Sequence, residues 1–152
     1  IVSGSDDQTI RLWNIDTGKE ERYTQSQEPF AEHGESVFSV AFSPNDKKIV
    51  SRHWDNTIVI WDVENRKPLV LKGHDDTVLS VALSLNGKTI VSSSTDGTIR
   101  VWDVATGEQL EIENYEGIEV GSVSFSHDGK TLVTGESDDT IKLWDVSCLV
   151  KD

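Results

Sequence analysis

The chain has 152 residues, enough for one domain with a buried core, and 36% of them are apolar, in runs too short to span a bilayer. Its net charge of −13, from 14 basic and 27 acidic residues, gives a field that repels nucleic acid and anionic membrane surfaces. The single cysteine, Cys148, excludes an internal disulfide and favours a cytoplasmic location.

Four segments along the chain share a seven-residue pattern that begins with Asp and ends with Trp, with Thr-Ile at a fixed offset. They are Asp7–Trp13, Asp55–Trp61, Asp96–Trp102 and Asp138–Trp144. The tryptophans are 48, 41 and 42 residues apart, and the polar stretch Lys19–His33 predicts a longer loop in the first interval. Such a pattern indicates an internal repeat of about forty residues.

Within each repeat, apolar residues alternate with a period of two, which is typical of β-strands. The pairs that share one strand face are Ile10/Leu12, Ile58/Ile60, Ile99/Val101 and Ile141/Leu143. Asn86-Gly87 and Asp128-Gly129 predict tight hairpin turns, because Asn, Asp and Gly tolerate positive φ. Each repeat is therefore predicted to be a short antiparallel meander whose sheet must stack on its neighbours.

These features resemble the WD-repeat β-propeller family, whose signature is a Gly-His pair followed by Trp-Asp. Gly73-His74 matches it, and so do Trp61-Asp62, Trp102-Asp103 and Trp144-Asp145, whereas Asn14 follows Trp13. The resemblance implies an all-β fold of about four blades, half of a seven- or eight-bladed ring within a longer protein. The blades are expected at about 1–28, 33–72, 73–113 and 116–152. The first lacks its innermost strand and Cys148–Asp152 forms the last, which makes fifteen strands.

The resemblance also implies that hydrogen-bonded His, Ser or Thr, Asp and Trp residues brace each blade. The expected sets are Ser3, Asp7 and Trp13; His33, Ser51, Asp55 and Trp61; His74, Ser92, Asp96 and Trp102; and Thr134, Asp138 and Trp144. Glu116 stands where the fourth blade should have its His. Ser, His and Asp also make up hydrolytic triads, but their recurrence in every blade favours a structural role. No ligand pair with metal-site spacing occurs, and no cofactor is expected.

Members of this family resemble one another in binding partners through one rim. The corresponding positions here are Asp6, Trp54, Thr95 and Ser137, just before the repeat Asp, and Ser36, Phe38, Thr77, Leu79, Glu119 and Gly121, three and five residues after the His position. Trp54 stands out because the other blades have small polar residues there, and Phe38 is expected beside it. Exposed aromatic residues are typical binding hot spots. The alternative is that Trp54 packs on the adjacent loop, with His53 or Arg52.

Acidic residues predict a charged surface on the fourth blade: Glu116, Glu119, Glu136 and Asp139. Such a surface either suits a basic peptide or is simply solvated. The function implied by the resemblance is a non-catalytic platform that binds other proteins or peptides. Two alternatives remain open: an obligate homodimer that closes an eight-bladed ring, and an enzyme with its site on the propeller loops.

Overall fold

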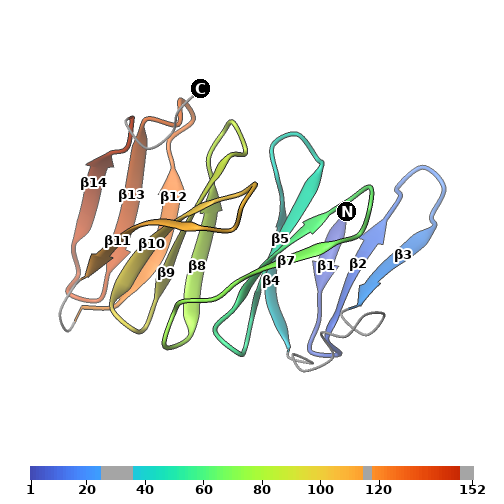
Figure 1. The fold of residues 1–152 in the computed structure, drawn as a ribbon, viewed down its shortest axis with the longest axis horizontal. Coiled ribbons are helices and arrows are strands. Elements are labelled where there is room, and N and C mark those ends of the chain that lie inside the picture. Colours follow the sequence, from blue (N-terminus) through green and yellow to red (C-terminus); the bar gives the residue numbers. More distant parts are fainter. Residues whose placement is uncertain (25–35, 115–117, 148–152) are drawn as a thin grey trace. The chain divides into compact units, whose positions relative to one another are not determined.

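The computed structural model describes residues 1–24, 36–114 and 118–147. Every helix or strand among these residues is a β-strand (Figure 1). The strands form four antiparallel sheets in two compact units, Ile1–Lys72 and Gly73–Asp152, with two sheets in each unit. The all-β fold of four blade-like sheets predicted from the repeats is therefore confirmed.

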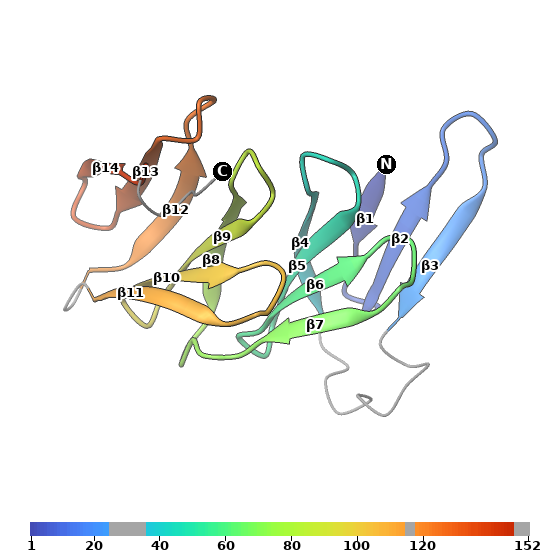
Figure 2. The same cartoon turned by 45° about the horizontal axis from the view of Figure 1, so that its top comes forward.

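The first unit contains a three-stranded and a four-stranded meander. The strands are β1 (Val2–Gly4), β2 (Thr9–Trp13) and β3 (Glu20–Thr24), then β4 (Val37–Phe42), β5 (Lys48–His53), β6 (Ile58–Asp62) and β7 (Pro68–Leu71). The two sheets pack where β1 lies beside β4 (Figure 2). Ile10 from the first sheet shares a core there with Val37 and Ile49 from the second, so burial of the alternating apolar face joins the two sheets.

The second unit is built in the same way. Its strands are β8 (Val78–Leu83), β9 (Thr89–Ser94), β10 (Thr98–Asp103) and β11 (Gln109–Asn114), then β12 (Val120–Phe125), β13 (Thr131–Glu136) and β14 (Ile141–Asp145). Ile99 and Val101 of β10 pack with Val120 and Val123 of β12 in the core between the sheets. The final strand expected at Cys148–Asp152 lies outside the described residues.

The residue after each repeat Trp organises the turn that follows. Oδ1 of Asp103 accepts hydrogen bonds from the backbone N–H groups two and three residues further on, both at 2.8 Å. Oδ1 of Asn14 accepts the equivalent pair at 3.0 Å. An amide oxygen can replace a carboxylate oxygen in this role, so Asn14 keeps the turn although it departs from the Trp-Asp signature.

Candidate functional site

The four residues predicted to brace the third sheet form one network. Trp102 Nε1 donates to Ser92 Oγ at 2.8 Å. Ser92 Oγ lies 2.7 Å from His74 Nε2, and His74 Nδ1 lies 2.9 Å from Asp96 Oδ2. The β9–β10 hairpin positions three of these residues, because Ser92 is in β9, Trp102 is in β10 and Asp96 is in the turn between them.

The electrostatics of this network follow from its burial. Burial lowers the pKa of His74, although the Asp96 carboxylate opposes the shift. Burial alone would raise the pKa of Asp96, but hydrogen bonds, led by the one from Thr98, outweigh it and lower that pKa to about 2. Near neutral pH, a neutral His74 therefore donates from Nδ1 to a charged Asp96. Nε2 then accepts the Ser92 hydroxyl, whose oxygen accepts from Trp102.

The order of these atoms matches a Ser-His-Asp triad, but their burial does not suit catalysis. Ser92 is 0% exposed and His74 is 7% exposed. A nucleophile needs an open approach for the substrate and a base directed at it, and the Ser92 oxygen is instead enclosed between Trp102 and His74. The network can brace the sheet, but Ser92 cannot reach a substrate.

The first two sheets have the same hub residue, the Ser whose hydroxyl oxygen accepts the hydrogen bond from the repeat Trp, but its other neighbours differ. In the second sheet, Trp61 Nε1 donates to Ser51 Oγ at 3.0 Å, and His53 Nε2 lies 2.8 Å from that oxygen. His33, which was expected to contact Ser51, lies outside the described residues. In the first sheet, the bond from Trp13 Nε1 to Ser3 Oγ is long, at 3.4 Å, and exposed.

The fourth sheet replaces the histidine with a buried carboxylate. Trp144 Nε1 donates to Thr134 Oγ1 at 3.1 Å, and Thr134 Oγ1 donates to Glu136 Oε1 at 3.2 Å. The Glu136 side chain is 0% exposed and pairs with Lys142 at 2.6 Å. Its predicted place on an acidic surface is therefore wrong, because its side chain points into the blade. Glu116, the other residue considered at this position, lies outside the described residues.

His53 and Glu136 are network members that the sequence analysis missed. Each lies two residues after the hub residue on the same strand, Ser51 or Thr134. Side chains at positions i and i+2 of a strand share a face, so this spacing is the signal that identifies them.

The predicted rim residues come together in the same way in three sheets. In each, the N–H of the residue before the repeat Asp donates to the carbonyl of a second predicted residue. The pairs are Trp54 and Ser36 (3.2 Å), Thr95 and Thr77 (3.0 Å), and Ser137 and Glu119 (2.9 Å). The register of the first strand then shifts, and the extra residues at these bulges are Phe38, Leu79 and Gly121. A bulge redirects the chain at its extra residue. In all three sheets this position therefore departs from the regular alternation of the strand. Asp6 is exposed in the β1–β2 turn of the first sheet.

Phe38 and Trp54 form an exposed aromatic pair on the second sheet. Their ring centroids lie 5.4 Å apart, with 50° between the ring planes. Trp54 is 62% exposed and Phe38 is 40% exposed. The guanidinium carbon of Arg52 lies 5.4 Å from the Phe38 centroid, and burial lowers the pKa of Arg52. Leu79 and Thr95, which hold the equivalent positions in the third sheet, are only partly exposed.

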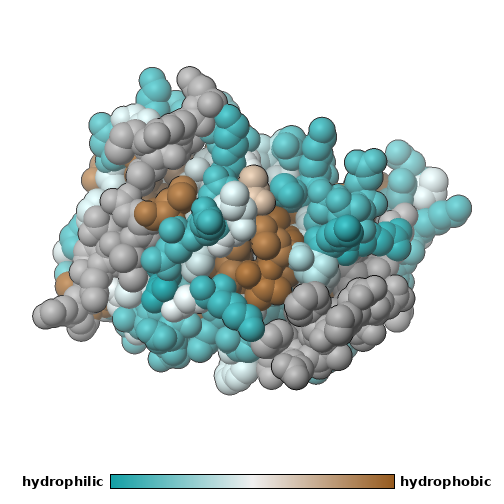
Figure 3. Space-filling view, viewed as in Figure 1, coloured by the Kyte–Doolittle hydropathy of each residue, from teal (hydrophilic) through white to brown (hydrophobic). Residues whose placement is uncertain are grey.

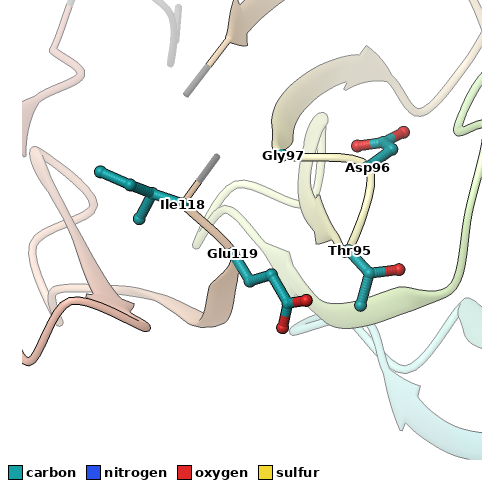
Figure 4. Close-up of a pocket in the computed structure, with 5 residues that line it drawn as sticks. All are labelled: Thr95, Asp96, Gly97, Ile118 and Glu119. Carbon is teal, nitrogen blue, oxygen red and sulfur yellow. The ribbon is translucent and has the colours of Figure 1, made fainter. Parts of the chain in front are cut away.

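The equivalent loops of the second unit carry acidic residues and no lysine or arginine. The loop segments are 75–77, 95–97, 118–119 and 137–140, and their acidic residues are Asp75, Asp76, Asp96, Glu119, Asp138 and Asp139. Thr95, Asp96 and Gly97 line a cavity of about 180 Å³ with Ile118 and Glu119 (Figure 4). Glu119 and Asp139 are exposed, so these loops still present an acidic surface without Glu136.

Other features of the described surface are less specific. Hydrophilic residues cover most of the face drawn in Figure 3, and apolar residues gather there in a few places. Among residues 1–24, 36–114 and 118–147, no group of three or more His, Cys, Asp or Glu side chains is arranged to hold a metal ion. The same residues include no helix with the length and apolarity needed to cross a membrane.

Comparison with known proteins gives matches over most of the chain. The family model described as "WD domain, G-beta repeat" matches residues 1–14, 24–62, 65–103 and 110–145. Small ribosomal subunit protein RACK1 of Candida albicans is 31% identical over 64 residues, which are 42% of this chain and 20% of that protein. Apoptotic protease-activating factor 1 of Rattus norvegicus is 39% identical over 75 residues, 49% of this chain and 6% of that protein. Ribosome assembly protein 4 of Saccharomyces cerevisiae is 39% identical over 70 residues, 44% of this chain and 12% of that protein. The chain thus matches at most a fifth of the length of these relatives.

Proposed function

The chain belongs to the WD-repeat family, and from this premise we propose that it is a non-catalytic platform that binds other proteins or peptides. The observation that carries the proposal is the exposed aromatic pair of Phe38 and Trp54. Large rings bury much area at a small cost in side-chain entropy, which is why they dominate many interfaces. Two of the relatives are named for a ribosomal subunit and for ribosome assembly, which supports a role in multicomponent assemblies.

The contribution of Trp54 follows from its exposure. A tryptophan offers up to about 250 Å² of surface, and 62% of this residue is exposed, so about 150 Å² remains to be covered. At about 25 cal/mol per Å², covering it is worth about 4 kcal/mol before the costs of association. Contact with Phe38 also restricts the Trp54 ring before binding, which lowers the entropy lost on binding.

The second unit supports a proposal about partner chemistry. Its acidic loops, with Asp75, Asp76, Glu119 and Asp139 among them, carry no lysine or arginine of their own. Such a surface would attract a basic peptide and speed its association, and salt would screen the effect. The alternative is a solvated acidic surface that contributes nothing to binding.

The test uses a peptide selected from a random displayed library on the 152-residue chain, with its affinity measured by calorimetry at two salt concentrations. Trp54→Ala should weaken binding by about 30-fold, the size of a hot-spot effect. The matched control is Ile15→Ala, because Ile15 is 76% exposed in a turn of the same unit and is not a predicted contact residue. Unchanged affinity in Trp54→Ala would refute the aromatic hot spot, and affinity that is insensitive to salt would refute the basic-peptide proposal.

A further inference from the structure

The turn between β8 and β9 contains an asparagine followed by a glycine, Asn86-Gly87. Asn86 is exposed, and Gly87 has φ of 68°. In such a pair the glycine nitrogen can attack the asparagine side chain, because glycine has no Cβ to block the approach. We propose that Asn86 is a site of spontaneous deamidation that its own turn protects while closed, and that this turn closes again around the aspartate product but not around isoaspartate.

The reaction needs only water as a co-reactant. The Gly87 nitrogen loses its proton and bonds to Cγ of Asn86, the bond from Cγ to Nδ2 breaks, and ammonia leaves a cyclic succinimide. Water then opens this ring at either carbonyl. The products are aspartate and isoaspartate, in which the main chain runs through Cβ and Cγ. Nothing is oxidised or reduced, and either product adds one negative charge to the net charge of −13.

Hydrogen bonds hold both reacting groups in the closed turn. Ser84 Oγ donates to Asn86 Oδ1 at 2.8 Å, and the Lys88 N–H donates to the same oxygen at 3.0 Å. The Gly87 N–H, whose nitrogen is the nucleophile, donates to the Ser84 carbonyl at 2.9 Å. Attack requires the turn to open, and each of these bonds is worth about two- to tenfold in the opening equilibrium. The closed turn therefore protects Asn86 from reaction.

The fourth sheet shows that a carboxylate fits this kind of turn. Asp128 stands in the β12–β13 turn at the position that Asn86 has in the β8–β9 turn. Ser126 Oγ donates to Asp128 Oδ1 at 2.6 Å, and the Lys130 N–H donates to it at 3.1 Å. An aspartate at position 86 would accept the same two hydrogen bonds with a carboxylate oxygen in place of the amide oxygen. The turn should therefore close again after this product forms.

Isoaspartate does not fit the same turn. It adds one carbon atom to the main chain before Gly87, and its carboxylate is attached directly to Cα. The Gly87 N–H and the carboxylate therefore cannot both keep the geometry in which they meet Ser84 and Lys88. Loss of these bonds should weaken the β8–β9 hairpin, so the fold discriminates between the two products after the reaction.

The second sheet provides a matched site in the same chain. Asn45 Oδ1 accepts from Ser43 Oγ at 2.8 Å and from the Lys47 N–H at 3.1 Å, so this turn is closed in the same way. The next residue is Asp46, with φ of 57°, and its Cβ hinders attack by its own nitrogen. Asn45 should therefore react more slowly than Asn86 even in the unfolded chain.

The experiment follows both asparagines by liquid chromatography and mass spectrometry of peptides from the 152-residue chain, aged at neutral pH with and without guanidinium chloride. In denaturant, Asn86 should react faster than Asn45, and folding should slow Asn86 by at least about tenfold. Ser84→Ala removes the hydroxyl from the turn and should speed the reaction of folded Asn86 by about threefold or more. Ser43→Ala is the matched control, because it makes the same change in the Asn45 turn.

Three results would overturn the protected site. No reaction of Asn86 in denaturant would show that it is not a deamidation site. Equal rates in the folded and unfolded chain would show that the turn does not protect it. Equal acceleration of Asn86 by Ser84→Ala and Ser43→Ala would show that unfolding of the whole chain, not opening of this turn, controls the reaction. None of these results depends on whether Trp54 binds a partner.

The choice between products has its own test. Asn86→Asp should keep the wild-type urea midpoint, because Asp128 makes the same bonds in its turn; a lower midpoint would refute the fit of aspartate. A short protease pulse on the aged chain, in urea near the midpoint, should digest isoaspartate chains before aspartate chains. Equal digestion of both would refute the discrimination.

Discussion

Two adjacent serines of β9 predict opposite effects on stability. Ser92 and Ser93 are both 0% exposed. The Ser92 hydroxyl bonds Trp102 and His74 at 2.8 and 2.7 Å. Ser92→Ala would leave the indole N–H and the imidazole nitrogen buried without their partner. Each such loss costs about 1–3 kcal/mol, so we expect a total destabilisation of about 2–6 kcal/mol in urea unfolding.

Ser93→Ala is the matched control, with the same atoms removed one residue away. Ser93 Oγ has no hydrogen-bond partner among the described residues. Removing a buried hydroxyl that makes no bond relieves its desolvation cost, so Ser93→Ala should leave stability unchanged or raise it by about 1 kcal/mol. If both variants lose equal stability, or if Ser92→Ala loses less than about 1 kcal/mol, the bracing role of Ser92 is wrong.

Three other local features predict changes in stability. Gln8 has φ of 69° at the turn position where Gly97 has φ of 77°, so Gln8→Gly should add about 1 kcal/mol; an unchanged or lower melting temperature would contradict this. Because burial lowers the pKa of His74, the contribution of neutral His74 to the free energy of unfolding is complete above pH 6.5 and is lost as pH falls toward the folded-state pKa. The urea midpoint of the wild-type chain should therefore fall between pH 7 and pH 5, and that of His74→Gln should fall less. An equal fall in both proteins would refute this role of His74. Lys142→Met should cost about 2 kcal/mol in urea unfolding by removing the partner of the buried Glu136 carboxylate; adding Glu136→Met should recover most of it, and a purely additive loss would exclude the coupling.

The spacing of the repeat predicted the parts of the structure that depend on local register. The fixed offset between Asp96 and Trp102 predicted that both lie on one hairpin. The offset of Ser92 from Asp96 predicted that Ser92 lies on the same hairpin and contacts Trp102. The neighbouring positions of Phe38 and Trp54 followed from the same register, and their rings lie 5.4 Å apart. Local periodicity suffices here because each hairpin forms from adjacent residues.

Other features depend on what surrounds a residue. Glu136 has the composition of a surface residue, yet its side chain is buried beside Thr134 and Lys142. Ile99 and Ile141 occupy the same place in the pattern, but one is 4% exposed and the other 75%. The difference lies in whether another strand packs on that face, which the periodicity of one strand cannot show.

The central claim is that this chain binds partners through the loops around Trp54 and their equivalents. Amide hydrogen exchange, with and without a peptide selected on the chain, tests it most directly. We expect slower exchange in the peptide complex at residues 52–57, the end of β5 and the loop that carries Trp54, and unchanged exchange at 44–47, in the turn at the other end of β5. Protection at 44–47 without protection at 52–57 would contradict the proposed binding surface.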